Sequence, residues 1–230
     1  LRMADQEHIL TIMIHHIATD GWSRGIIRRE LTALYNAQVL GQTPALPSLA
    51  VQYADFALWQ RQWLSGEVLE QQLVYWRARL ADASTLDLPT DRPRPPVQSQ
   101  SGASHTFRIS ELLTRDLRAV SREEEVTLAT TLLASFQVLL ARYTGQSDIS
   151  VGSPVANRPR PELEKLVGFF VNSLVMRTDL SGDPTFREVL ARVNEVAFGA
   201  YEHQDVPFEQ LVAELLPERD CSRTPLCQGM

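Results

Sequence analysis

The stretch IHHIATDGWS, residues 14–23, places two adjacent histidines, an aspartate, a glycine and a helix-starting serine next to one another. The apolar run before it, residues 8–14, is rich in β-branched side chains and predicts a buried strand. Ser23 can cap a helix over residues 23–39, where apolar side chains recur at helical spacing. The histidines are therefore expected where a strand ends and a helix begins, a place that exposes side chains and leaves backbone N–H groups unpaired.

The residue pattern argues against a metal site, a serine or cysteine nucleophile, and ATP chemistry. Successive residues of a strand point to opposite faces, so only one of His15 and His16 can face a given cleft. Because the two rings diverge and no third histidine follows at the spacing of a metal-binding helix, no metal site is expected. The sequence has no G-x-S-x-G pattern, and its two cysteines, Cys221 and Cys227, lie in the terminal segment, so a serine or cysteine nucleophile is not expected. Glycine-rich phosphate loops are absent as well, which argues against ATP chemistry.

The bulk composition is that of a globular protein with a sizeable core. The 230 residues are 44% hydrophobic and 22% charged. A net charge of −6 and a pI near 5.4 argue against a nucleic-acid partner, which would need a basic face. The sequence holds no apolar run long enough to span a membrane and no signal peptide, so a cytoplasmic protein without a membrane partner is expected. Two cysteines are too few for a disulfide framework or a zinc ribbon.

Strands alternate with long helices along the chain, which predicts a layered α/β fold. A connector is expected at 41–49, and the proline-rich segment 82–104 is expected to be a linker or an extended strap that is not packed. The predicted helices cover residues 23–39, 49–64, 67–80, 110–124, 127–143, 184–201 and 207–216, and the predicted strands residues 8–14, 105–109, 148–155 and 170–178.

Four stretches together carry a family resemblance. The pattern His-His-x-x-x-Asp-Gly of residues 15–21, with Trp-Ser after it, resembles the signature of condensation domains of nonribosomal peptide synthetases, which belong with the chloramphenicol-acetyltransferase-like acyltransferases. Three further stretches are similar to motifs of the same family, in the family's order. They are YADFALWQ at 53–60, VGFFVNSLVMR at 167–177, and the C-terminal stretch 203–226, which contains HQDVPFE at 203–209 and RDCSRTPL at 219–226.

The resemblance implies a layered sandwich of two acetyltransferase-like halves with the active site in a tunnel between them. On this interpretation residues 1–48 are the end of the N-terminal half, residues 49–230 are most of the C-terminal half, and the chain is a fragment truncated at both ends. The implied activity is amide-bond formation between an acyl or peptidyl thioester on an upstream carrier protein and the amine of an aminoacyl thioester on a downstream one. The implied partners are those carrier domains and an adenylation domain of the same synthetase. The domain needs no cofactor of its own, since phosphopantetheine is carried by the partners.

The same resemblance also indicates a subtype within the condensation domains. Gly-Trp-Ser after Asp20 favours condensation over the heterocyclising variant, whose first motif begins with Asp in place of His. The stretches 203–209 and 219–226 indicate the subtype that accepts an L-residue donor. Two alternatives stay open: a free-standing acyltransferase of the same superfamily that uses coenzyme A, and a condensation-like domain that docks partners without catalysis.

Within the first motif, His16 is predicted to be the catalytic residue because it occupies the position of the family's second histidine. A neutral imidazole, with an ordinary pKa of about 6.5, can receive or organise the proton that an attacking amine sheds. Whether His16 is a base or a positioning group is left open. His15 is expected to point the other way and to pack against the neighbouring Thr11 and Met13 in a structural role.

The rest of the motif is expected to support the histidine. Asp20 can cap the backbone donors that follow it or pair with an arginine, and so fix the loop that aims His16. The sequence does not identify this arginine, which is either one in the chain, such as Arg158, or one in the N-terminal part that is expected to be missing. Gly21 is interpreted as a residue needed for an unusual φ or for close approach of a substrate arm, and its N–H could help to stabilise an oxyanion. Trp22 is expected in the core.

Two polar residues interrupt an otherwise apolar predicted strand. Asn172 and Ser173 need partners there, either at an edge or bulge position of the sheet or, as the family resemblance implies, beside the substrate tunnel. They are therefore candidates for contact with the pantetheine arm or the growing chain.

Overall fold

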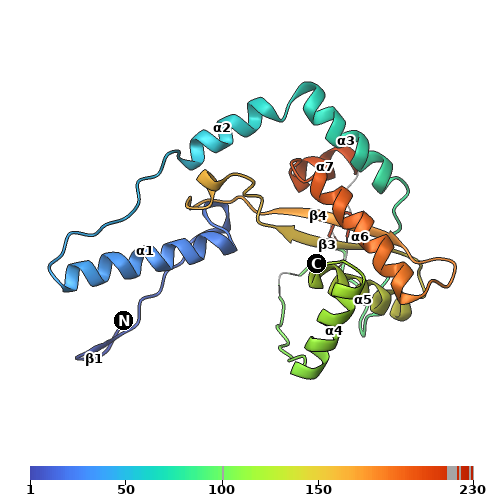
Figure 1. Ribbon diagram of the computed structural model, residues 1–230, viewed down its shortest axis with the longest axis horizontal. Coiled ribbons are helices and arrows are strands. Elements are labelled where there is room, and N and C mark those ends of the chain that lie inside the picture. The colour runs from blue at the N-terminus through green and yellow to red at the C-terminus, as the bar shows by residue number, and fades with distance from the viewer. Residues whose placement is uncertain (100, 217–221, 223, 228, 230) are drawn as a thin grey trace. The chain divides into compact units, whose positions relative to one another are not determined.

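The computed structural model describes residues 1–99, 101–216, 222, 224–227 and 229, so much of the motif at 219–226 lies outside the described residues. Contacts between residues divide the chain into two compact units, Leu1–Trp63 with Ala156–Val171, and Leu64–Val155 with Asn172–Met230. Each unit is described by itself, and Figure 1 labels its elements. The predicted boundary between two halves at residue 48 stays a prediction.

The first unit holds two long helices and a small core. Its elements are β1 (Arg2–Ala4), β2 (Glu7–His8), the 3-10 turn η1 (His16–Ala18), α1 (Gly21–Val39), α2 (Tyr53–Trp63) and the 3-10 turn η2 (Pro161–Leu163). Strands β1 and β2 pair antiparallel. The core joins Phe56 of α2 to Leu163, Leu166 and Phe170 from the segment around and after η2. This packing places the 163–170 loop beside the start of α2.

Two predicted strands are wrong. Of residues 8–14 only His8 is in a strand, and the side chain of Met13 is 92% exposed. Residues 105–109 form no strand either, and Phe107 is 75% exposed. A strand is stabilised by a hydrogen-bonded neighbour and by burial of one face, and within the described ranges residues 9–14 and 105–109 have no ladder partner.

The second unit is built on an antiparallel hairpin covered by helices. Strands β3 (Asp148–Val155) and β4 (Asn172–Asp179) pair without a register shift, from Asp148 opposite Asp179 to Val155 opposite Asn172. Helix α5 contacts β3, and α6 contacts both β4 and α5, which confirms the predicted α/β layering. The helices are α3 (Gly66–Leu80), α4 (Glu111–Glu123), α5 (Leu128–Thr144), α6 (Phe186–Glu202) and α7 (Phe208–Leu215).

Local sequence signals set several of these helix ends. The Ser110 side chain accepts a hydrogen bond from a backbone N–H in the first turn of α4, and Thr127 does the same for α5. Gly145 ends α5 with a φ of 71°, a left-handed conformation that glycine adopts without strain. Thr185 and Glu188 form a reciprocal capping box at the start of α6. These start and stop positions agree with the predicted ones to within two residues.

The strap that follows α3 is anchored at its beginning, which corrects the expectation that it is unpacked. Leu86 is 2% exposed and packs against Ile149 in the hydrophobic cluster beside β3. Arg177 of β4 pairs with Asp148 of β3 at 2.8 Å and donates to the Ala81 carbonyl at 2.6 Å. From residue 89 onward the described part of the strap is exposed and has no regular structure, as predicted.

Within the part of the chain that the structure describes, no single helix has the length and apolar character to cross a membrane. Helices α4 and α5 meet that test only when taken together, and they are bent by 105° at the break between them.

Candidate functional site

The first helix begins at Gly21 and is capped by Asp20, so the prediction that Ser23 caps it is wrong. Asp20 has an extended backbone and its Oδ1 accepts a hydrogen bond from the Ser23 N–H at 2.8 Å. This is the usual N-cap geometry, in which a side-chain oxygen satisfies one of the free donors of the first turn. Ser23 is fully buried inside that turn, and its hydroxyl donates to the Gly168 carbonyl at 2.9 Å. The capping role predicted for Asp20 is confirmed.

A buried ion pair joins the start of α1 to the 163–170 loop. Arg158 Nη2 lies 3.3 Å from both oxygens of Asp20, and each side chain is 2% exposed. Nη1 of Arg158 also donates to the carbonyls of Leu163 and, at 2.9 Å, Leu166. The second oxygen of Asp20 accepts the Phe170 N–H at 3.0 Å. Arg158 is thus the arginine that the sequence could only name as a candidate.

Burial and ion pairing have opposite effects on the pKa values of Asp20 and Arg158. Burial alone would raise the pKa of Asp20, but the hydrogen bonds from Ser23 and Phe170 and the charge of Arg158 outweigh it, and the pKa lies below its ordinary value of 3.8. Burial lowers the pKa of Arg158, and the neighbouring Asp20 only partly offsets this effect. The carboxylate of Asp20 is therefore ionised at neutral pH and serves as a structural anchor.

His15 and His16 precede Asp20 by a few residues in the sequence. His16 is the first residue of η1, is exposed, and its ring makes no hydrogen bond within the described ranges. The ring meets Phe169 in a T-shaped contact, with centroids 5.3 Å apart and planes at 83°. His15 is exposed too, and its Nδ1 accepts the Ile17 N–H at 3.1 Å. Its predicted packing against strand neighbours is wrong, because no strand forms here and the alternation of faces does not apply.

Gly21 and Trp22 also differ from expectation. The φ of Gly21 is outside the left-handed region, and an added Cβ would meet only the Arg24 side chain at 3.7 Å, so the unusual-φ interpretation is wrong. Approach of a substrate arm to Gly21 and a role for its N–H in stabilising an oxyanion stay predictions. Trp22 is 48% exposed and not in the core; its Nε1 donates to the Glu164 carbonyl at 2.9 Å, a further bond to the loop.

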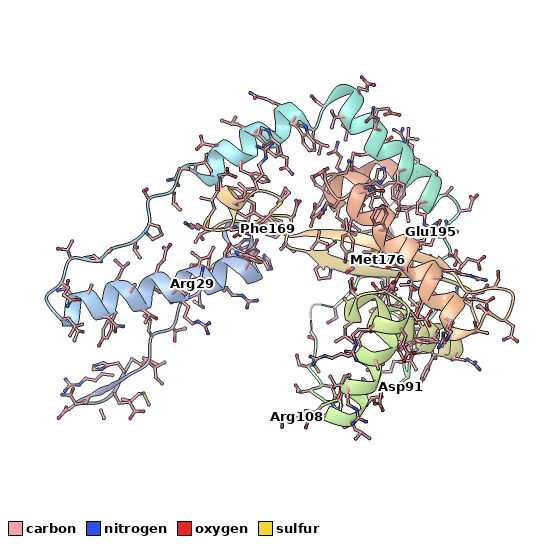
Figure 2. All side chains as sticks on the ribbon, in the orientation of Figure 1. Arg29, Asp91, Arg108, Phe169, Met176 and Glu195 are labelled. Carbon is pink, nitrogen blue, oxygen red and sulfur yellow. The ribbon has the colours of Figure 1, made fainter. Side chains whose placement is uncertain are left out.

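Sequence reasoning missed Tyr53 and Gly168 as parts of this arrangement. The Tyr53 hydroxyl donates to the Phe169 carbonyl at 2.8 Å. A Cβ on Gly168 would lie 2.2 Å from Cδ2 of Tyr53, so only glycine permits this close approach. Both residues fall in motifs of the family resemblance, and their position there was the only available signal. Figure 2 labels Phe169 on the loop that precedes β4.

The two predicted tunnel residues belong to the second unit. The Asn172 amide donates to the carbonyls of Gln204 and Val206, both at 2.8 Å, and its oxygen accepts the N–H groups of Phe208 at 3.0 Å and Ser173 at 2.9 Å. These four bonds use the donors and acceptors of the amide to capacity. Asn172 therefore holds the turn between α6 and α7 to the start of β4. Contact of Asn172 or Ser173 with a substrate stays a prediction.

The described residues contain no group of three or more His, Cys, Asp and Glu side chains that could hold a metal ion. The arrangement around His16 offers an exposed imidazole next to a loop held by hydrogen bonds, and such a ring can accept a proton or a hydrogen bond from a substrate.

Comparison with known proteins gives a consistent result. The family model of the condensation domain matches residues 1–230. A linear gramicidin synthase from Brevibacillus parabrevis is 58% identical over all of this chain, which covers 4% of that relative's length. The chain therefore spans only a small part of this curated relative.

Solved structures agree with the sequence matches. The X-domain from teicoplanin biosynthesis, solved in complex with OxyB, has a TM-score of 0.85 and 33% identity, covering 93% of this chain and 48% of that one. The four-domain nonribosomal peptide synthetase holo-AB3403 has a TM-score of 0.81 and 29% identity, covering 94% of this chain and 16% of that one. These matches confirm the predicted chloramphenicol-acetyltransferase-like fold class.

Proposed function

The chain belongs to the condensation-domain family of nonribosomal peptide synthetases, and we propose that it joins an acyl or peptidyl thioester on an upstream carrier domain to the amine of an aminoacyl thioester on a downstream carrier domain. The amine nitrogen attacks the thioester carbonyl and forms the C–N bond. The C–S bond then breaks, the donor arm leaves as a thiol, and the amine loses one proton.

The observation that carries this proposal is the His16 imidazole. It is exposed and, among the described residues, has no hydrogen-bond partner of its own, while the backbone just beyond it is fixed by the buried pair of Asp20 and Arg158. A free ring nitrogen can accept the proton of the attacking amine or hold that amine by a hydrogen bond. The first role makes His16 a base and the second a positioning group.

The partners follow from the same proposal. Phosphopantetheine is carried by the two carrier domains, so the condensation domain brings no cofactor of its own, and an adenylation domain loads the downstream carrier. The stretches HQDVPFE at 203–209 and RDCSRTPL at 219–226 favour an L-residue donor. The proposed setting is the cytoplasm, where a multidomain synthetase finds its activated amino acids.

The test is amide formation between two loaded carriers in the synthetase module that contains this chain. His16→Ala should lower product formation by about 10²–10⁴-fold if the histidine is a base, with an unchanged melting temperature. His8→Ala, a substitution of an exposed histidine on β2, is the matched control and should leave turnover unchanged. Turnover of His16→Ala above about a tenth of the unsubstituted protein would contradict the role of a base.

A second candidate is a module that docks partner proteins without catalysis. Its support is the similarity to the X-domain, which has been solved in complex with OxyB. Under this alternative neither the unsubstituted protein nor His16→Ala would form the amide, and substitutions on the surface would abolish partner binding. A free-standing acyltransferase would instead use coenzyme A thioesters; the synthetase relative weighs against it. Replacing the donor carrier by a coenzyme A thioester in the same assay distinguishes this third case.

A further inference from the structure

The orientation of the His16 ring depends on few contacts. A histidine side chain has two rotatable bonds and populates several rotamers unless something selects one of them. Within the described ranges no hydrogen bond holds the imidazole, and its ring contact is the one with Phe169, at 5.3 Å between centroids. The 83° angle between the planes is the edge-to-face geometry that aromatic pairs favour. A change in the position of Phe169 would therefore alter the ring contact that His16 makes within the described ranges.

Phe169 lies on a stretch of backbone that several side chains hold by hydrogen bonds. Three successive residues, 168–170, each make a backbone hydrogen bond to a different side chain at the start of α1 or α2. These bonds are Gly168 N–H to Ser23 Oγ at 3.1 Å, Tyr53 Oη–H to the Phe169 carbonyl at 2.8 Å, and Phe170 N–H to Asp20 Oδ2 at 3.0 Å.

Tyr53 donates its hydrogen bond to Phe169, the residue whose ring contacts His16. Its ring packs edge-on against Phe170, with centroids 5.1 Å apart, and fits over Gly168 in a space that a Cβ would occupy. Burial, together with the nearby Asp20 charge, raises the pKa of Tyr53, so its hydroxyl keeps the proton that it donates to Phe169. The tyrosine therefore offers a permanent donor at a fixed position.

We propose that Phe169 is a positioning residue that sets the orientation of the His16 imidazole, and that Tyr53 fixes Phe169 through its carbonyl. This inference rests on the proposed function, because it needs His16 to take part in the reaction. In this role both side chains act through His16 and not on a carrier, so losing the Phe169 ring should lower kcat and leave KM for both loaded carriers unchanged.

The experiment combines kinetics and NMR of the synthetase module that contains this chain, labelled with ¹³C at its histidine rings. The His16 signal is assigned by its loss in His16→Ala. In Phe169→Leu the His16 ring protons should lose the ring-current displacement caused by Phe169, and kcat should fall by about 10- to 100-fold. Phe169→Tyr keeps an aromatic ring and should restore both the signal and kcat. Phe198→Leu, a substitution of an exposed phenylalanine on α6, is the matched control and should change neither.

Tyr53→Phe removes only the hydroxyl and tests the anchor even if Phe169→Leu does not fold. It should move the His16 signal in the same direction and lower kcat by a smaller factor, with KM unchanged. A His16 signal that is the same in Phe169→Leu and Tyr53→Phe as in the unsubstituted chain would overturn the inference. A shifted signal with unchanged kcat, or a rise in KM alone, would overturn it as well. Full turnover by His16→Ala would instead refute the proposed function, whereas the NMR signals decide the ring contact independently of activity.

Discussion

Replacing Asp20 by asparagine tests whether the buried ion pair is a structural anchor. Asparagine can still accept the Ser23 N–H, which Asp20 binds at 2.8 Å. Its NH₂ group, however, would face two donors, the Phe170 N–H and the guanidinium of Arg158, in place of a carboxylate oxygen. Arg158 would be left 2% exposed without a counter-charge. Because removing one partner of a buried pair typically costs about 3–5 kcal/mol, Asp20→Asn should lower the free energy of unfolding by that amount.

The assay is equilibrium unfolding in urea, followed by tryptophan fluorescence. The matched control is Asp5→Asn, which breaks an exposed pair with Arg2 whose side chains are 65% and 90% accessible and should cost about 0–1 kcal/mol. A loss in Asp20→Asn no greater than in the control would refute the anchor. An Asp20→Asn protein of unchanged stability that makes no amide would show that Asp20 acts in the chemistry instead.

The same pair predicts a pH dependence. The pKa of Asp20 is lower in the folded chain than its ordinary value of 3.8, so the unfolded chain binds the proton more readily. The stabilisation is therefore complete above that value and is lost as the pH falls through the folded pKa. The stability difference between the unsubstituted chain and Asp20→Asn should shrink as the pH drops below 3.8. A difference that stays constant over this range would contradict the sign of the shift.

Three further substitutions test individual contacts. Gly168→Ala would place a Cβ 2.2 Å from the Tyr53 ring and should cost about 1–3 kcal/mol through forced repacking, measured by urea unfolding; Gly102→Ala, where a Cβ meets no atom within 4 Å, should cost nothing measurable. Asn172→Ala leaves buried backbone donors and acceptors without partners and should cost at least about 1–3 kcal/mol in the same assay, and an unchanged midpoint would show that water replaces these bonds freely. His15→Ala removes the acceptor for a single N–H at the start of η1 and should lower the free energy of unfolding by about 0.5–2 kcal/mol. Aggregation of this variant would point to a larger role for His15.

Elements with their own local signals were predictable from the sequence. Strand β3 was predicted at its observed bounds, and the capping residues Ser110, Thr127 and Thr185 were at or next to the predicted helix starts. These signals work because a cap acts on backbone groups within the next turn, so the information lies within a few residues. The four family motifs likewise identified the fold class.

The features that the sequence did not predict depend on contacts between segments far apart in the chain. Residues 8–14 have the composition of a strand, but a ladder needs a second chain segment, and composition does not supply one. The sequence assigned Asp20 a cap or an arginine partner, yet it contains 22 lysines and arginines, and only folding brings Arg158 to it across a separation of 138 residues. Tyr53 reaches Phe169 over 116 residues in the same way. The sequence by itself thus determined the family and the elements that carry local signals, whereas the tertiary structure alone decided what holds His16, because burial and pairing between distant segments are properties of the packed chain.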